Sequence, residues 1–190
     1  MDNLLKIINY LGKNHQQSFT QHQLSNLLNI PYATFYRTVQ AIGHLLVTKV
    51  IGKSKTIQIN FNNSVIKSYL AIASDEEGRE YFKKQPIINK ISTELNTKEI
   101  VLLFGSYAKK TATEKSDIDI IIINKYGKKS ISFSKYELLF KKKINPIFVT
   151  EKEFITMLKD KEENIGKQAL KNHIVLNSPE EFWRCVLHGI

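Results

Sequence analysis

The sequence is poor in the residues that build covalent or metal-stabilised frameworks. It has a single cysteine, Cys185, and only four prolines, so a disulfide framework and a cysteine metal site are excluded. The five histidines are scattered, without the spacing of a zinc site. No Walker lysine motif, Rossmann glycine pattern or Gly-x-Ser-x-Gly elbow occurs.

Long apolar runs are also missing, and no segment reaches the length that spans a bilayer. The N-terminal residues 1–6 lack the layout of a signal peptide. We therefore expect a cytoplasmic protein with no membrane partner. A hydrophobic fraction of 42% and an aromatic fraction of 10% fit a globular chain.

Acidic residues are scarce in the N-terminal third. The formal net charge of the chain is +10, and residues 1–60 hold six Lys/Arg but one acid, Asp2. A basic segment nearly free of carboxylates is suited to bind a phosphate backbone. The alternative is a lysine-rich segment that is merely well solvated.

The same segment has the pattern of three helices and a hairpin. Apolar residues recur at helical spacing over 4–11, Thr20 and Gln23 form a capping box, and a third helix starts at about Tyr32. Two β-rich stretches, 47–51 and 56–60, follow. This order resembles a winged helix-turn-helix domain, which we assign to residues 1–62.

In a domain of that kind the third helix reads DNA, and the hairpin contacts the flanking backbone. The exposed side of this helix and the hairpin tip supply the candidate DNA-binding residues: Tyr32, Thr34, Tyr36, Arg37, Gln40, Lys53 and Lys55. Arg and Gln can pair with base edges, and the hydroxyls suit phosphates. Docking of a protein instead of DNA is the alternative, and a homodimer is a possible arrangement on a palindromic DNA site.

Residues 63–85 read as a helical connector. Two helices are predicted, 65–73 and 76–84, with Ser74-Asp75 as a cap between them. Residues 86–190 then form the second domain, in which Trp183 is expected to be core. The lysine run 141–143 is interpreted as a solvated helix end, or else as a surface that holds an acidic or nucleic-acid partner.

Two buried strands of this second domain frame the most informative motif. Residues 101–104 lead into Gly105-Ser106, and Asp117 and Asp119 open the apolar run 120–123. Alternation along a strand puts both carboxylates on one face. Carboxylates suit Mg²⁺, and a Gly-Ser turn offers backbone N–H groups and a hydroxyl to an anion. The alternative is that Asp117 and Asp119 have no function and simply form the solvated start of a strand.

This Gly-Ser and Asp-x-Asp combination resembles the nucleotidyltransferase superfamily that includes DNA polymerase beta, and most closely its minimal nucleotidyltransferase (MNT) branch. The resemblance implies an α+β fold with a mixed sheet flanked by helices. It implies that Gly105 and Ser106 hold a nucleoside triphosphate, and that Asp117 and Asp119 are catalytic and bind two Mg²⁺ or Mn²⁺ ions. The implied reaction transfers a nucleoside monophosphate to a hydroxyl group.

The chain departs from that family at two positions. Lys110 stands where a second glycine is usual, and Asn145 stands on the strand where a third carboxylate is expected. Asn cannot act as a base. A carboxylate from elsewhere, such as Glu99 or Glu151, would restore a full catalytic set if it lay within metal reach of Asp117 and Asp119.

Two functions therefore stay open. The first is a DNA-binding nucleotidyltransferase whose acceptor is a hydroxyl on a partner protein, as when an antitoxin of the MNT branch modifies its paired toxin. The second is a transcriptional regulator whose degenerate site senses a nucleotide.

Overall fold

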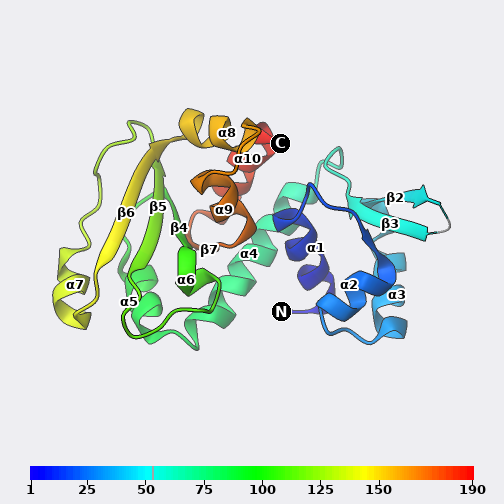
Figure 1. Cartoon of the computed structure of the whole chain (residues 1–190), viewed down its shortest axis with the longest axis horizontal. Helices are drawn as coiled ribbons and strands as arrows, with labels where there is room; N and C mark the ends of the chain where they lie inside the picture. The colour runs from blue at the N-terminus through cyan, green and yellow to red at the C-terminus, as the bar shows by residue number, and fades with distance from the viewer. Residues whose placement is uncertain (53) are drawn as a thin grey trace. The chain divides into compact units, whose positions relative to one another are not determined.

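The computed structural model describes residues 1–52 and 54–190, which fall into two compact units, Met1–Ala73 and Ser74–Ile190 (Figure 1). Lys53, one of the predicted DNA-binding residues, lies outside the described residues.

Unit 1 is built from short helices and a small antiparallel sheet. Its elements are α1 (Asn3–Lys13), β1 (Phe19–Thr20), α2 (Gln21–Leu27), α3 (Tyr32–Ala41), the 3-10 helix η1 (Gly43–Leu45), β2 (Leu46–Ile51) and β3 (Ser54–Ile59). The strand order is β1-β3-β2. The Thr20–Gln23 capping box starts α2, and Phe35 on α3 is fully buried. Three α-helices followed by the β2–β3 hairpin occur in the predicted order, and β1 and η1 are additional elements. The winged helix-turn-helix assignment itself stays a prediction.

The predicted break at Ser74 does not exist, because α4 (Ile66–Phe82) is one continuous helix. Ser74 is fully buried, and its hydroxyl accepts a hydrogen bond of 2.8 Å from the indole N–H of Trp183. A serine whose hydroxyl is bonded to a tertiary partner is not available as a cap. The boundary between the two units falls inside this helix.

Unit 2 contains a four-stranded mixed sheet with helices around it, as predicted for the α+β fold. Its elements are the end of α4, α5 (Pro86–Glu94), β4 (Ile100–Phe104), α6 (Gly105–Ala108), β5 (Ile118–Asn124), α7 (Ser134–Phe140), β6 (Ile144–Thr150), α8 (Glu151–Lys159), α9 (Ile165–Lys171), β7 (Ile174–Asn177) and α10 (Pro179–Gly189). The strand order is β6-β5-β4-β7. β5 and β6 are parallel, and β4 is antiparallel to β5 and β7.

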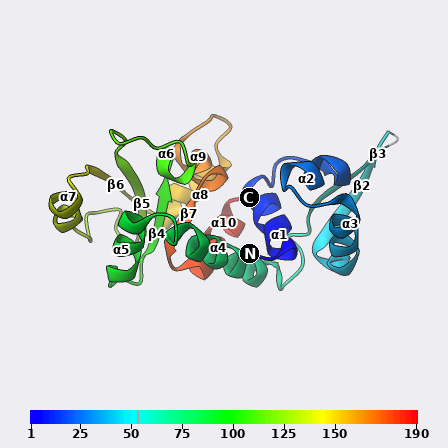
Figure 2. The same ribbon diagram turned by 90° about the horizontal axis from the view of Figure 1, so that it is seen from below.

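The two faces of this sheet differ in character. Ile120 and Ile122 belong to a core cluster with Ile88 and Ile91 of α5. Because side chains alternate along a strand, Asp119 and Ile121 belong to the opposite face. Figures 1 and 2 show α5 on one side of the sheet and α9 on the other. The polar site therefore lies on the face away from α5.

Two further predictions concern Trp183 and membrane-spanning helices. Trp183 is fully buried, so its assignment to the core is confirmed. Over the residues that the structure describes, no helix combines the length and apolar character needed to cross a membrane.

Candidate active site

The turn at Gly105 brings the end of β4 against Asp119 of β5. Phe104 and Asp119 are register partners in the antiparallel pair, and the chain leaves the strand through Gly105 at a φ of +69°. A Cβ atom at Gly105 would lie 2.2 Å from Oδ2 of Asp119. Glycine is therefore required twice, for the left-handed backbone and for the close approach. The structure joins Gly105, Ser106 and Asp119 in one place.

Asp117 lies two residues before Asp119, on the same side of the sheet. Its side chain is 40% exposed, and Nζ of Lys143 lies 3.7 Å from its Oδ2. An ion pair this long and this exposed contributes little to stability. Asp117 is thus open to solvent and to a ligand.

Asn145 completes the cluster from the neighbouring strand. It is the register partner of Asp119 in the parallel β5–β6 pair. Its Nδ2 donates to Oδ2 of Asp117 at 3.3 Å and to Oδ1 of Asp119 at 3.2 Å. One amide thus bridges both carboxylates and offsets part of their mutual repulsion.

Neither carboxylate proposed as a replacement reaches this cluster. Glu99 precedes β4 and accepts a hydrogen bond of 2.6 Å from Ser130, and Glu151 binds Arg184 through two bonds of 2.8 Å. Both lie at the other end of the sheet, beyond the Ile100–Ile123 and Asn124–Thr150 register pairs. Five or six residues of strand, at roughly 3.3 Å each, separate them from the cluster.

Comparison with known families identifies the domain. The model of the family "Polymerase beta, Nucleotidyltransferase" matches residues 86–182, which is just over half of the chain and includes the whole cluster. The chain belongs to this nucleotidyltransferase family. No curated protein and no solved structure matches it. The predicted superfamily is confirmed.

Nucleotidyltransferases of this family typically use a divalent metal and a nucleoside triphosphate. Within residues 1–52 and 54–190 there is no group of three or more His, Cys, Asp or Glu side chains that could hold a metal ion. Mg²⁺ is nevertheless often bound by one or two carboxylates together with phosphate oxygens and water. Asp117 and Asp119 fit an ion of that kind, and Asn145 can add its carbonyl oxygen once the amide rotates.

The segment after Ser106 in the nucleotidyltransferase domain is held by buried and backbone contacts. The hydroxyl of Tyr81, on α4, donates to the carbonyl of Tyr107 at 2.9 Å. Burial, with a smaller contribution from Tyr107, raises the pKa of Tyr81 to about 12. The phenol therefore stays protonated and remains a donor at neutral pH. The backbone N–H of Thr111 donates to the carbonyl of Ser106 at 2.9 Å, which closes the turn.

Lys110 keeps the left-handed backbone that a glycine would adopt there, with a φ of +59°. A non-glycine residue pays about 1–2 kcal/mol for this conformation. Glycine has more conformational freedom in the unfolded chain, and losing it on folding costs about 0.5–1 kcal/mol, which offsets part of the gain. We expect Lys110→Gly to raise the free energy of unfolding by up to about 1 kcal/mol, measured by urea denaturation. A fall in stability would show that the lysine side chain contributes more than its backbone costs.

In unit 1, the predicted DNA-binding residues divide between two surfaces. Tyr32, Tyr36, Gln40 and Lys55 line one cavity, whereas Thr34 and Arg37 are exposed on α3 outside it. The cavity also contains His22 and Ser54, which the sequence did not single out. The ring of His22 on α2 lies 5.7 Å from that of Tyr32 on α3, and this contact between two helices is not visible in the sequence pattern.

Proposed function

We propose that unit 2 transfers a nucleoside monophosphate from a Mg²⁺-bound nucleoside triphosphate to a hydroxyl group. The observation that carries this proposal is the contact of the Gly105 turn with Asp119, beside Asp117. A glycine turn packed against one carboxylate of a neighbouring pair is an arrangement with no evident structural purpose, and it is suited to hold a phosphate beside a cation. Two carboxylates this close together repel each other, and a bound cation would relieve that repulsion.

Each residue of the cluster has a role in this proposal. Ser106 and the backbone N–H groups of the turn hold the terminal phosphates. Asp117 and Asp119 bind the cation, which when present neutralises charge on the phosphates. Asn145 orients the two carboxylates. The acceptor oxygen bonds to the α-phosphorus, the bond to the β-phosphate oxygen breaks, pyrophosphate leaves, and the hydroxyl proton goes to solvent.

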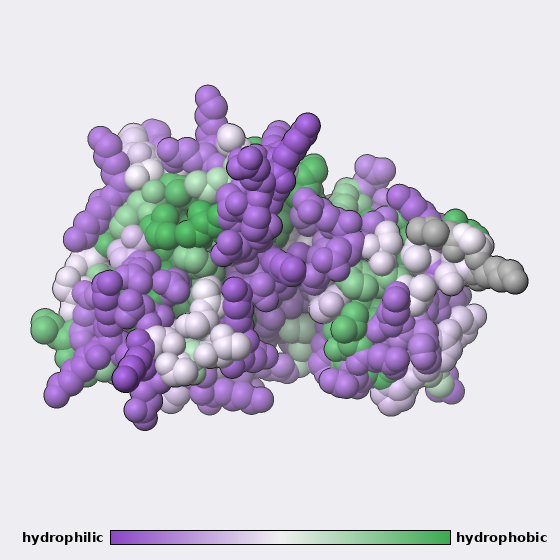
Figure 3. Space-filling view, in the orientation of Figure 1, coloured by the Kyte–Doolittle hydropathy of each residue, from purple (hydrophilic) through white to green (hydrophobic). Residues whose placement is uncertain are grey.

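An apolar surface of unit 2 lies next to the cluster and could receive the acceptor. Ile147 and Val149 follow Asn145 on the same face of β6, and Ile147 is partly exposed. Figure 3 shows a hydrophobic surface framed by hydrophilic side chains where Figure 1 draws β5 and β6. A hydroxyl on a partner protein, such as a toxin paired with this chain as its antitoxin, is the acceptor we propose for this surface.

DNA binding is the second part of the proposal and belongs to unit 1. This unit contains seven Lys/Arg and one acid, Asp2. Arg37 and Gln40 are both exposed on α3. A basic unit with these side chains on one helix favours a phosphate backbone and base edges. An antitoxin of this design modifies its partner and represses its own operon, as a monomer or as a homodimer.

A regulator that senses a nucleotide without turning it over is the second candidate. Asn145 favours it, because the amide occupies the place of a third carboxylate and donates to both aspartates. Such a site binds a nucleotide and its metal but has no base for the attacking hydroxyl.

Titration with ATP, CTP, GTP and UTP in Mg²⁺ or Mn²⁺ tests both candidates. Binding is measured by calorimetry, and pyrophosphate release is measured with cell lysate as the source of acceptor. We expect metal-dependent binding and release in the wild type and the loss of both in Asp117→Asn/Asp119→Asn, which keeps side-chain volume but removes the charges. The matched control is Asp160→Asn, an exposed aspartate beyond α8.

The outcomes separate the candidates. Aspartate-dependent release makes the labelled product the acceptor. Binding without release under every condition favours the regulator. Absence of any metal-dependent nucleotide binding contradicts both.

A further inference from the structure

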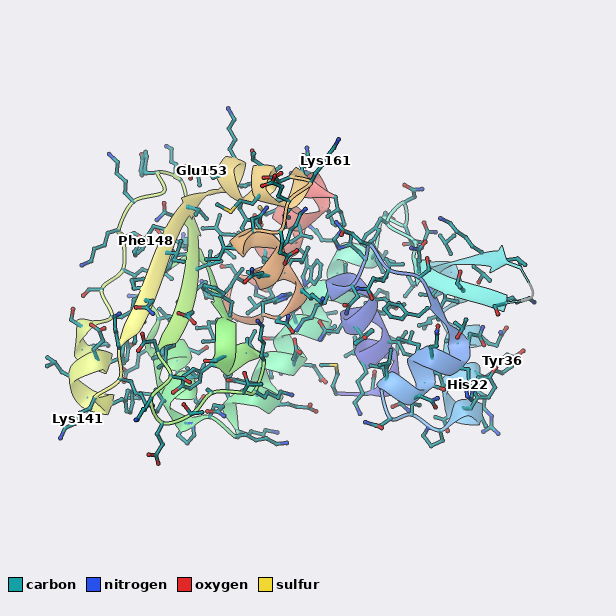
Figure 4. All side chains as sticks on the ribbon, in the orientation of Figure 1. His22, Tyr36, Lys141, Phe148, Glu153 and Lys161 are labelled. Carbon is teal, nitrogen blue, oxygen red and sulfur yellow. The ribbon has the colours of Figure 1, made fainter. Side chains whose placement is uncertain are left out.

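Unit 1 carries a cavity of about 410 Å³ between α2, α3 and β3. It is lined by Thr20, Gln21, His22, Tyr32, Tyr36, Gln40, Ser54 and Lys55. Figure 4 labels His22 and Tyr36, which lie close together at the surface of this unit. The volume is within the range of about 300–1,000 Å³ that is typical of small-molecule sites.

Three aromatic rings form one wall of the cavity. The centroids of His22 and Tyr32 lie 5.7 Å apart, and those of Tyr32 and Tyr36 lie 6.4 Å apart. The planes are tilted by 56° and 34°, so the rings do not cover one another face to face. Tyr32 is 48% exposed and Tyr36 is 47% exposed. Two phenol rings therefore offer uncovered faces to a planar ligand.

The charge around this wall excludes cationic ligands. No carboxylate lines the cavity, and none occurs anywhere between Asp2 and Asp75 in the sequence. The side chain of Asp2 is bonded to the first turn of α1 through Leu5. Lys55, by contrast, is exposed at the rim. The ligand that fits combines a planar apolar ring with a negative charge.

We infer that the cavity holds one unpaired base of a nucleic acid, with the base stacked on Tyr32 and Tyr36 and its phosphate beside Lys55. This inference rests on the proposed DNA binding of unit 1 and goes beyond it. In an intact duplex the faces of the bases are stacked on each other and are closed to a side chain. Aromatic faces in a basic groove are instead the means by which proteins bind unstacked bases.

Polar side chains at the edges of the cavity complete the site. The amides of Gln21 and Gln40 and the hydroxyl of Ser54 line it. An amide provides both donors and an acceptor, so it can pair with the edge of any base. The stacking contribution depends little on sequence. The cavity thus adds affinity for an unpaired position, while Arg37 is left to contact the flanking duplex.

Fluorescence anisotropy with three DNA probes at one salt concentration tests the inference. The probes are a flush duplex, the same duplex with one unpaired thymidine, and that duplex with an abasic residue at the unpaired position. We expect the wild type to bind the unpaired thymidine about 10-fold or more tightly than the abasic probe, given the usual strength of base–aromatic stacking. Tyr32→Leu/Tyr36→Leu should remove this preference.

Matched variants separate stacking from loss of the fold. Tyr32→Phe/Tyr36→Phe keeps both rings and should keep the preference, and Tyr126→Leu changes a tyrosine of unit 2 that is 70% exposed. Quenching of 2-aminopurine at the unpaired position reports stacking directly. Equal affinity for the unpaired and abasic probes in the wild type overturns the inference, as does a preference that survives in the double Leu variant. Equal binding of all three probes leaves duplex binding intact, whereas no binding to any probe overturns the DNA-binding proposal as well.

Discussion

Gly105→Ala is expected to abolish nucleotide transfer and to destabilise unit 2. The new Cβ atom would lie 2.2 Å from Oδ2 of Asp119, far inside van der Waals contact. Asp119 has little freedom to retreat, because its other oxygen accepts a hydrogen bond from Asn145. Either the turn or the carboxylate must move, and a displacement of about 1 Å at a reacting centre can cost roughly 100-fold in rate.

The stability cost of Gly105→Ala has two parts. Alanine at a φ of +69° is unfavourable by about 1 kcal/mol or more. The forced shift of Asp119 or of the turn adds about 1–3 kcal/mol, as overpacking does elsewhere. We expect the free energy of unfolding to fall by about 2–4 kcal/mol, measured by urea denaturation followed by circular dichroism.

Gly127→Ala is the matched control, because Gly127 has a φ of +61° and its nearest neighbours lie 3.2–3.3 Å from a new Cβ. It shares the backbone penalty but lies near Thr150, at the other end of the sheet. Nucleotide binding should survive in Gly127→Ala and fail in Gly105→Ala. If both variants bind nucleotide equally well, the Gly105 turn is not part of the site.

The local sequence pattern accounts for much of the fold and for half of the site. Apolar runs predicted β4 and β5. The Gly-Ser and Asp-x-Asp motifs predicted that a polar segment connects the end of the first strand to the start of the second. These features depend on residues close together in the chain. The superfamily followed from the same residues and is confirmed by the family match.

Features that depend on distant partners could not be predicted. The hydroxyl of Ser74 is bonded to Trp183, 109 residues away, so a residue that reads as a cap lies inside a continuous helix. The Tyr81–Tyr107 bond that supports the turn likewise joins two different elements. The conformation of Lys110 could not be predicted for another reason: its backbone is left-handed, but the residue is not the glycine that usually indicates this conformation.

Arg184 holds Glu151 away from the catalytic cluster. The guanidinium of Arg184 binds Glu151 through two hydrogen bonds and Glu181 through one. Its hydrogen bonds to Glu151 lower the pKa of that carboxyl group. Glu151 and Asn145 are only six residues apart in the sequence. The extended strand nevertheless separates the two residues, because Glu151 follows the end of β6 and Asn145 lies near its start.

Asn145→Asp is expected to have the second large effect, and it separates the two candidate functions. The substitution supplies a third carboxylate where the amide now donates to Asp117 and Asp119. If the site binds a nucleotide and its metal but lacks a base, a base at this position should raise the rate of pyrophosphate release by roughly 100-fold or more. If the wild type is already an efficient transferase, the gain should be much smaller.

The same variant reports on the metal through stability. Without a cation, Asn145→Asp loses two hydrogen bonds and gathers three carboxylates, so we expect the free energy of unfolding to fall by about 1–3 kcal/mol. Saturating Mg²⁺ should recover most of that loss, because the added charge strengthens binding of the cation to the folded state alone. The control Asn145→Ala loses the same hydrogen bonds without adding charge, so Mg²⁺ held by Asp117 and Asp119 alone should stabilise it less than it stabilises the Asp variant. If Mg²⁺ stabilises neither variant, the cluster does not bind the metal; if it stabilises both equally, the third carboxylate contributes nothing to metal binding.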